Sequence, residues 1–194
     1  MLRNGLRRGP YEMHFSRRSK LFEIMEIKGV KVFAHWSVLV IGTVVLLGGI
    51  QEPLLAFAVL AACYGLILIH ECGHMIAARR KGCAVWSIEL YPVWGITRFS
   101  EPYSRFDACV IAWAGVVAQG IVGIPLVAWV EVFGYTHFEP VNAILAILGF
   151  FNLGIAALNL LPVPPLDGAI AWGLLSALFK PSTRPVRRDP GWRS

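Results

Sequence analysis

The 194-residue chain is long enough for one soluble domain or one compact membrane bundle, and its composition separates these two classes. Hydrophobic residues make up 56% of the chain and charged residues only 15%, which excludes an ordinary soluble domain. The formal net charge of +6 does not indicate a nucleic-acid-binding protein, because the basic residues lie at the two ends and beside the apolar runs. That distribution favours a protein oriented in a bilayer that contains anionic lipids.

The residues before the first long apolar run form a basic arm. Residues 1–31 are rich in Lys and Arg, the apolar run begins only after them, and no convincing signal-peptidase site follows. We therefore predict a cytosolic N-terminal arm over residues 1–31, with a short strand or surface element between Glu23 and Lys31. Residues 181–194 are also basic and are predicted to form a cytosolic tail, which leaves residues 32–180 as the core.

Apolar stretches at residues 32–50, 53–81, 107–133 and 141–161 predict a bundle of about four transmembrane helices. His35, at the start of the first stretch, is interpreted as an interfacial residue, with a functional role as the alternative. Pro53 suits the first position of the second helix, and Gly82 suits its C-terminal cap. Arg79 and Arg80 indicate that this end is cytoplasmic. With a cytosolic start, both termini of this multi-pass cell-membrane protein would be cytoplasmic.

Residues 83–100, between the second and third predicted helices, have the pattern of strands. Residues 84–90 alternate between the two faces of a strand, residues 91–95 contain turn-forming Pro and Gly, and residues 96–99 form a return strand. Such backbone cannot face lipid, so we predict a small membrane-associated β segment. Residues 169–179 form a short C-terminal helix, and the sequence leaves open whether it re-enters the membrane. The fold class is therefore an α-helical, polytopic membrane protein.

The second predicted helix contains the motif His70-Glu71-Cys72-Gly73-His74. Two histidines four residues apart lie on one face of a helix, and the glutamate between them can accept a proton from metal-bound water, as in zinc peptidases. A rise of ~1.5 Å per residue places His70 about 25 Å beyond Pro53, in the cytoplasmic third of a ~30 Å core. The chain has four cysteines without C-x-x-C spacing, so we expect no disulfides, and we interpret Cys72 as a packing residue rather than a ligand.

A catalytic zinc ion usually has three protein ligands, so the two histidines need a third. Asp167 is the best candidate, because it follows a proline-rich connector at the cytoplasmic end of the fourth predicted span. Glu89 and Glu101 are competitors without such a connector, and Asp167 could instead cap the following helix. Gln119 is polar near the middle of the third span, where it either bonds a neighbouring helix or takes part in function.

The two elements together, His70-Glu71-x-x-His74 and the later Asn159-x-x-Pro162-x-Pro164-x-Leu166-Asp167-Gly168, resemble the site-2 protease family of intramembrane zinc metalloproteases. The resemblance covers roughly residues 32–179. It implies zinc as the cofactor, Asp167 as the third ligand, Glu71 as the general base and Asn159 near the substrate or the oxyanion. Residues 83–99 are similar to the family's membrane-associated β segment.

The chain departs from the family pattern in the third span. Many members have A-G-P-x-x-N there, whereas this chain has Ala114-Gly115-Val116-Val117-Ala118-Gln119, with neither the proline nor the asparagine. Gln119 keeps an amide of different reach, and a substrate-binding role for it is the weakest of the site predictions. No PDZ or CBS domain is expected within the chain, which resembles a minimal catalytic core.

The resemblance implies hydrolysis of peptide bonds in transmembrane segments, as in regulated intramembrane proteolysis. The expected partners are a single-span membrane-protein substrate and the lipid bilayer, with no nucleic acid; the oligomeric state stays open. The alternative is a catalytically silent relative that acts as a membrane-protein binding or quality-control factor, although such a relative normally lacks a ligand or the glutamate. Another kind of membrane zinc hydrolase is a third hypothesis, and the proline-rich element around Asp167 argues against it.

Overall fold

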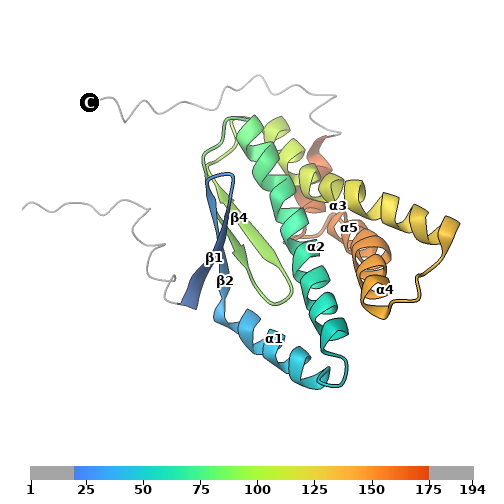
Figure 1. Cartoon of the computed structure of the whole chain (residues 1–194). Helices are drawn as coiled ribbons and strands as arrows, with labels where there is room; N and C mark the ends of the chain where they lie inside the picture. The colour runs from blue at the N-terminus through green and yellow to red at the C-terminus, as the bar shows by residue number, and fades with distance from the viewer. Residues whose placement is uncertain (1–19, 175–194) are drawn as a thin grey trace, which may run out of the picture.

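A computed structural model describes residues 20–174, and helix α2, Pro53–Arg80, is its central element. A four-stranded sheet lies on one side of α2, and helices α3, α4 and α5 lie on the other (Figure 1). Pro53 occupies the first turn of α2, as expected, and Gly82 ends it with a positive φ of 78°. The Cys83 N–H then bonds to the Ala78 carbonyl oxygen at 2.9 Å, which satisfies a carbonyl that the helix end would leave free.

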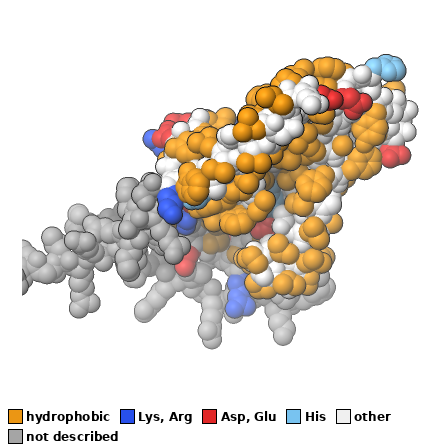
Figure 2. Space-filling model, turned by 90° about the horizontal axis from the view of Figure 1, so that it is seen from below, with side chains coloured by type: hydrophobic (Ala, Val, Ile, Leu, Met, Phe, Trp, Pro, Cys, Tyr) orange, Lys and Arg blue, Asp and Glu red, His pale blue; other side chains and the backbone are white. Residues whose placement is uncertain are grey.

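Within residues 20–174, three helices are long and apolar enough to cross a membrane. The first is α2, and the second is α3, Arg105–Phe133, where the Ser104 hydroxyl caps the helix by accepting a bond from the Asp107 N–H. The third runs over Glu139–Asn159 and combines α4, Glu139–Leu145, a π-helical segment η2, Ala146–Phe151, and α5, Asn152–Asn159. Hydrophobic side chains cover most of the described face in Figure 2, as lipid contact requires.

The predicted first span, residues 32–50, is wrong as a continuous helix. Residues Val30–His35 form strand β2, and helix α1 covers only Trp36–Gly48, which is 13 residues and shorter than the other three. An apolar run is compatible with a buried strand as well as with a helix, so its hydrophobicity could not locate the change at His35. The described chain therefore has three helices of spanning length plus a short apolar one.

The strands form one sheet in the order β1-β2-β3-β4, with β1 at Leu21–Ile27, β3 at Val85–Leu90 and β4 at Gly95–Phe99. The two hairpins are antiparallel, and β2 pairs with β3 in parallel. The predicted hairpin within residues 83–100 is confirmed. β1 confirms the strand expected between Glu23 and Lys31, and it pairs with β2 across the proposed boundary at residue 31.

One face of the sheet packs against α2 through a buried apolar cluster. Ile88 and Leu90 of β3 and two valines of β2 surround Met75 of α2. The alternation predicted for β3 is only partly present, because Ser87 and Glu89 on its other face are buried too. Arg98 of β4 compensates the Glu89 charge through contacts of 2.6 and 2.9 Å, and the hydrogen bonding that the guanidinium donates to this carboxylate raises the pKa of Arg98.

The sheet runs beside the C-terminal part of α2, from the basic end of the helix to the motif. At one end, Arg79 donates a 2.6 Å hydrogen bond to the Lys28 carbonyl oxygen in the β1–β2 turn. At the other end, Gly95, which pairs with Leu90, lies against Glu71. The β segment therefore packs on protein at the predicted depth of the motif, as its backbone requires.

Helices α2 and α3 approach each other most closely within the motif itself. A Cβ atom added at Gly73 would collide with the Ala114 carbonyl group and would lie 2.9 Å from the Ala118 Cβ. Such small-residue contacts let helices pack tightly where lipid supplies no hydrophobic driving force. Helix α6, Gly168–Ala171, packs against α3 near this crossing. The remainder of the predicted C-terminal helix, the tail and residues 1–19 lie outside the described residues.

Replacing Gly73 by alanine is expected to force α2 away from α3 and to lower the free energy of unfolding by about 1–3 kcal/mol, as overpacking typically does. Thermal unfolding in detergent measures the change. Gly65→Ala is the matched control, because Gly65 lies on the same helix with nothing within 4 Å of an added Cβ. Equal unfolding midpoints for the two variants would contradict the close crossing.

Candidate metal and active site

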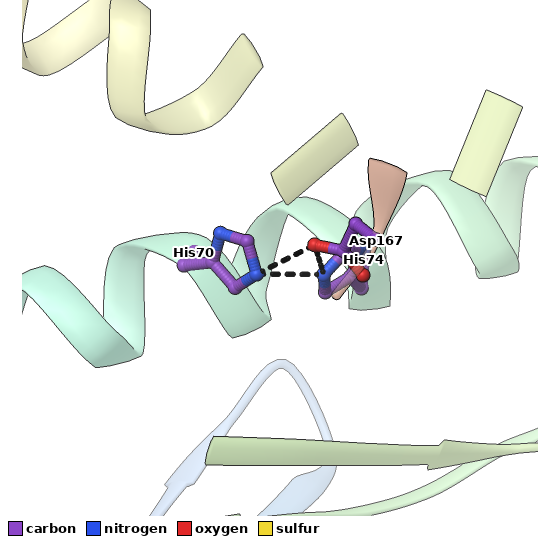
Figure 3. A group of neighbouring side chains, drawn as sticks. All are labelled: His70, His74 and Asp167. Carbon is purple, nitrogen blue, oxygen red and sulfur yellow. Dashed lines mark hydrogen bonds and ion pairs between the residues drawn. The ribbon is translucent and has the colours of Figure 1, made fainter. Parts of the chain in front are cut away.

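His70 and His74 of α2 converge with Asp167, which comes from a distant part of the chain (Figure 3). The Nε2 atoms of His70 and His74 lie 3.0 Å apart, and Asp167 Oδ2 lies 3.0 Å from the first and 3.2 Å from the second. Among residues 20–174 they form a group of His, Cys, Asp and Glu side chains that could hold a metal ion. Tetrahedral zinc with bonds of about 2.0–2.2 Å requires ligand separations of about 3.3–3.6 Å, slightly longer than those observed.

The other nitrogen of each imidazole is already bonded, and this fixes what the facing nitrogens can do. His74 Nδ1 lies 2.8 Å from the Ile111 carbonyl oxygen, which only accepts, so Nδ1 carries the proton. His70 Nδ1 lies 2.9 Å from Gln119 Oε1 and donates in the same way. In the neutral rings both Nε2 atoms therefore present lone pairs toward each other and toward Asp167. Such a donor set repels itself unless a cation lies within it, and it fits zinc.

Asp167 reaches the histidines through the connector after α5. The Pro164–Pro165 peptide bond in this connector is cis. The Asp167 side chain makes no capping bond to α6, so the capping alternative is not observed.

Contacts from α3 hold the connector and α6 in place. Trp113 Nε1 donates to the Ala171 carbonyl oxygen at 3.0 Å, and Cys109 Sγ lies 3.2 Å from the Ile170 carbonyl oxygen. Trp172 Nε1 closes the connector by bonding to the Leu160 carbonyl oxygen at 2.6 Å. The position of Asp167 therefore depends on tertiary contacts with α3 as well as on the prolines.

Gly115 of α3 makes room for the two imidazoles. A Cβ atom at this position would lie 2.6 Å from His70 Cε1 and 2.7 Å from His74 Cε1 and Nε2. This glycine therefore packs on the rings themselves. Any larger residue at position 115 would displace both histidines at once.

The side chain of Glu71 contacts the sheet. It is only 4% exposed, and its Oε2 atom accepts a 2.7 Å hydrogen bond from the Thr97 hydroxyl of β4. The general base proposed from the motif is thus held by the β segment.

Gln119 is fully buried and bonds to His70, 49 residues away in sequence. Gln119 is itself connected to the Glu139–Asn159 helix, because Asn152 Nδ2 donates to the Gln119 backbone oxygen at 2.9 Å. This arrangement gives Gln119 a contact with a candidate ligand, and no surface open to a substrate. The second half of each amide, Gln119 Nε2 and Asn152 Oδ1, has no hydrogen-bond partner within the described chain.

The other candidates lie apart from the convergence point. Asn159 is partly buried at the end of α5, and a role near the substrate stays a prediction. Glu89 is paired with Arg98, and Glu101 is exposed, so neither competes with Asp167. Cys72 packs beside the apolar cluster of β2 and β3, as expected. His35 caps α1, accepting from the Ser37 N–H, and stacks on Tyr91, so the structure gives it a local role.

Sequence reasoning missed Thr97, Asn152 and the carbonyl of Ile111. A threonine in a strand and an asparagine in an apolar helix are both ordinary, and a backbone carbonyl has no sequence signal at all. Asn152 could have been questioned as Gln119 was, because both are polar residues within predicted spans.

No protein-family model matches the chain, whereas curated proteins and a solved structure are similar to it. The zinc metalloprotease MJ0392 of Methanocaldococcus jannaschii is 27% identical over 161 residues, which cover 80% of this chain and 44% of that protein. Rip3 of Mycobacterium tuberculosis, also named as a zinc metalloprotease, is 32% identical over 162 residues, covering 73% of this chain and 40% of Rip3. The chain thus spans less than half the length of these curated relatives.

A solved structure gives the same result for the fold. The site-2 protease from Methanocaldococcus jannaschii superposes with a TM-score of 0.61 at 21% sequence identity, covering 81% of this chain and 72% of that one. Its likeness in fold complements the likeness in sequence to the zinc metalloproteases. Similarity in sequence to named zinc metalloproteases and in fold to a site-2 protease structure supports the assignment of this chain to the site-2 protease family.

Proposed function

We propose that the chain is an intramembrane zinc metalloprotease that hydrolyses peptide bonds in the transmembrane segments of other membrane proteins. The observation that carries the proposal is the convergence of His70, His74 and Asp167 beside Glu71 on an apolar helix long enough to span a bilayer. The named relatives support the class of chemistry, and the apolar surroundings support a membrane-protein substrate.

In the proposed mechanism, His70 Nε2, His74 Nε2 and Asp167 Oδ2 would hold the zinc ion, and Gln119 and Ile111 fix the tautomers of the two rings. Zinc, when bound, would lower the pKa of a water molecule to about 7 and polarise the substrate carbonyl. Glu71 would act as the general base, taking a proton from the attacking water and passing it to the leaving amine nitrogen. Asn159 is assigned a place near the substrate or the oxyanion, as the family resemblance implies.

A catalytically silent relative is the second candidate function. Loss of a metal ligand or of the glutamate would favour it, but His70, Glu71, His74 and Asp167 are all present. The enzyme is therefore the better hypothesis.

The orientation of the protein follows from charge. Arg79, Arg80 and the β1–β2 turn with Lys28 lie together at one end of α2, and we assign this end to the cytoplasm of a cell-membrane protein. The site then lies at the cytoplasmic third of the bilayer. We retain the proposal that both termini are cytoplasmic.

A substrate helix must unwind before its carbonyls become accessible, and we propose that β4 receives the unwound segment. β4 is an edge strand whose Thr97 side chain contacts Glu71. Tyr91 N bonds to Trp94 O, so by the alternation of an antiparallel ladder Ile96 bonds to β3, whereas Gly95 and Thr97 direct their backbone groups outward. An extended substrate could satisfy its own backbone there.

Glu71→Gln is expected to reduce cleavage of a single-span substrate by about 10²- to 10⁴-fold, because the amide cannot accept the proton of water. Zinc content should stay at the wild-type level, since Glu71 is not a proposed ligand. Proteolysis in liposomes and metal analysis of the same sample measure both effects. Full activity of the variant would refute the mechanism.

Asp167→Ala is expected to lose bound zinc, and cleavage with it, because two imidazoles alone make an incomplete site. Elemental analysis after dialysis checks the loss. Glu101→Ala is the control, since Glu101 is exposed and lies outside the metal-ligand group. Retention of stoichiometric zinc by Asp167→Ala would exclude this residue as the third ligand.

Strand addition predicts a crosslink between β4 and the substrate. In a Glu71→Gln protein with Cys63 and Cys72 replaced by alanine, a cysteine at Ile96 should form disulfides with cysteines at alternate positions of the unwound substrate segment. Ile24 of β1, at the opposite edge of the sheet, is the control position; the exposed fractions of Ile24 and Ile96 are 45% and 37%. Equal crosslinking from both edges would count against a substrate strand on β4.

A further inference from the structure

The carboxylate of Glu71 is enclosed by two residues of β4. Thr97 Oγ1 lies 2.7 Å from Glu71 Oε2 and 3.0 Å from the Glu71 backbone oxygen. Gly95, two residues earlier on the same strand, lies against the other side of the carboxylate. The side chain that the motif supplies is therefore positioned by a different element of the fold.

The hydrogen bond has a defined direction. An ionised carboxylate can only accept, so the Thr97 hydroxyl must be the donor to Oε2. Within the described residues, Thr97 is the side-chain hydrogen-bond partner of a carboxylate that is almost fully buried. This bond commits Oε2 to the sheet and leaves Oε1 as the oxygen that can receive a proton. The bond also survives protonation at Oε1, because Oε2 then becomes a carbonyl oxygen and still accepts.

Gly95 restricts the same carboxylate by close approach. A Cβ atom at position 95 would lie 2.5 Å from Glu71 Cγ, 2.7 Å from Oε1 and 2.8 Å from Cδ. The glutamate therefore occupies the space that any other residue at position 95 would fill. Thr97 holds the carboxylate from one oxygen, and the Gly95 backbone bounds the space beside the other.

We propose that Thr97 is a positioning residue for the general base, and that Gly95 provides the space in which Thr97 holds Glu71. This inference rests on the proposed proteolytic function and deepens it, because it names what aims Glu71. Thr97 makes no contact with the proposed metal ligands in the described structure, so its loss should affect catalysis without removing zinc.

Kinetics of Thr97→Val and Thr97→Ser test the proposal. Valine keeps the shape of threonine without the hydroxyl, and serine keeps the hydroxyl. We expect Thr97→Val to lower kcat by about 10- to 100-fold, the usual range for losing a bond to a charged group that aims a reacting atom. KM, zinc content and the unfolding midpoint should stay close to wild type, and Thr97→Ser should recover most of kcat. Thr43→Val, at an exposed position of α1, is the matched control.

A spectroscopic measurement that needs neither metal nor substrate is the second readout. The infrared difference between wild type and Glu71→Gln isolates the carboxylate stretching band of Glu71. That band should shift in Thr97→Val, because the hydrogen bond to Oε2 is gone, and should return in Thr97→Ser. Gly95→Ala is expected to shift it as well and to lower kcat, whereas Gly154→Ala, with nothing within 4 Å of the added Cβ, should do neither.

The possible failures can be told apart. If Thr97→Val cleaves the substrate as fast as wild type and the Glu71 carboxylate band is unshifted, the role of Thr97 is overturned and the proposed function stays intact. Equal loss of kcat in the valine and serine variants would assign Thr97 a structural role only and would also overturn the proposal. A zinc-loaded wild type that cleaves no membrane substrate would overturn the proposed function and this inference together.

Discussion

Two imidazole nitrogens and a carboxylate oxygen face one another across 3.0–3.2 Å in apolar surroundings. Because both imidazoles donate through Nδ1, the three facing atoms are electron-rich, and their mutual repulsion is strongest where the dielectric is low. Packing must therefore impose the arrangement. The glycine at the helix crossing, the bonds from Gln119 and Ile111, and the anchored connector all oppose the separation of these atoms. Without them, a metal site could not be assembled in advance of its ion.

The site divides its tasks among separate elements. Helix α2 supplies both histidines and the glutamate, α3 orients the histidine rings, and the connector after α5 supplies Asp167. The sheet is not merely attached to this bundle, because β4 bonds to Glu71 directly. The base and the two histidine ligands thus share one helix but are held from opposite sides. A change in the sheet can therefore alter proton transfer while the metal ligands stay in place.

Local patterns in the sequence were sufficient where the chemistry is local. The spacing of His70 and His74 placed both rings on one face, the end of α2 at Gly82 followed from its capping residue, and the alternation and turn after Cys83 located a hairpin. The apolar run at residues 32–50 failed because hydrophobicity alone cannot show where a buried strand becomes a helix. The partners of Gln119 and Glu71 could not be predicted for another reason. They lie on other elements, and only tertiary packing brings them together.

The π-helical segment Ala146–Phe151 has a consequence for the Glu139–Asn159 helix. A π turn accommodates about one residue more than an α turn, so residues after it are rotated by roughly 100° relative to an uninterrupted helix. Asn152 is the first residue after this shift, and it faces Gln119. In a regular helix the same asparagine would turn toward a different neighbour. The rotation of the Glu139–Asn159 helix about its axis, rather than its hydrophobicity, thus connects it through Gln119 to His70. Deletion of a single residue in the π-helical segment would preserve a membrane helix but break that connection.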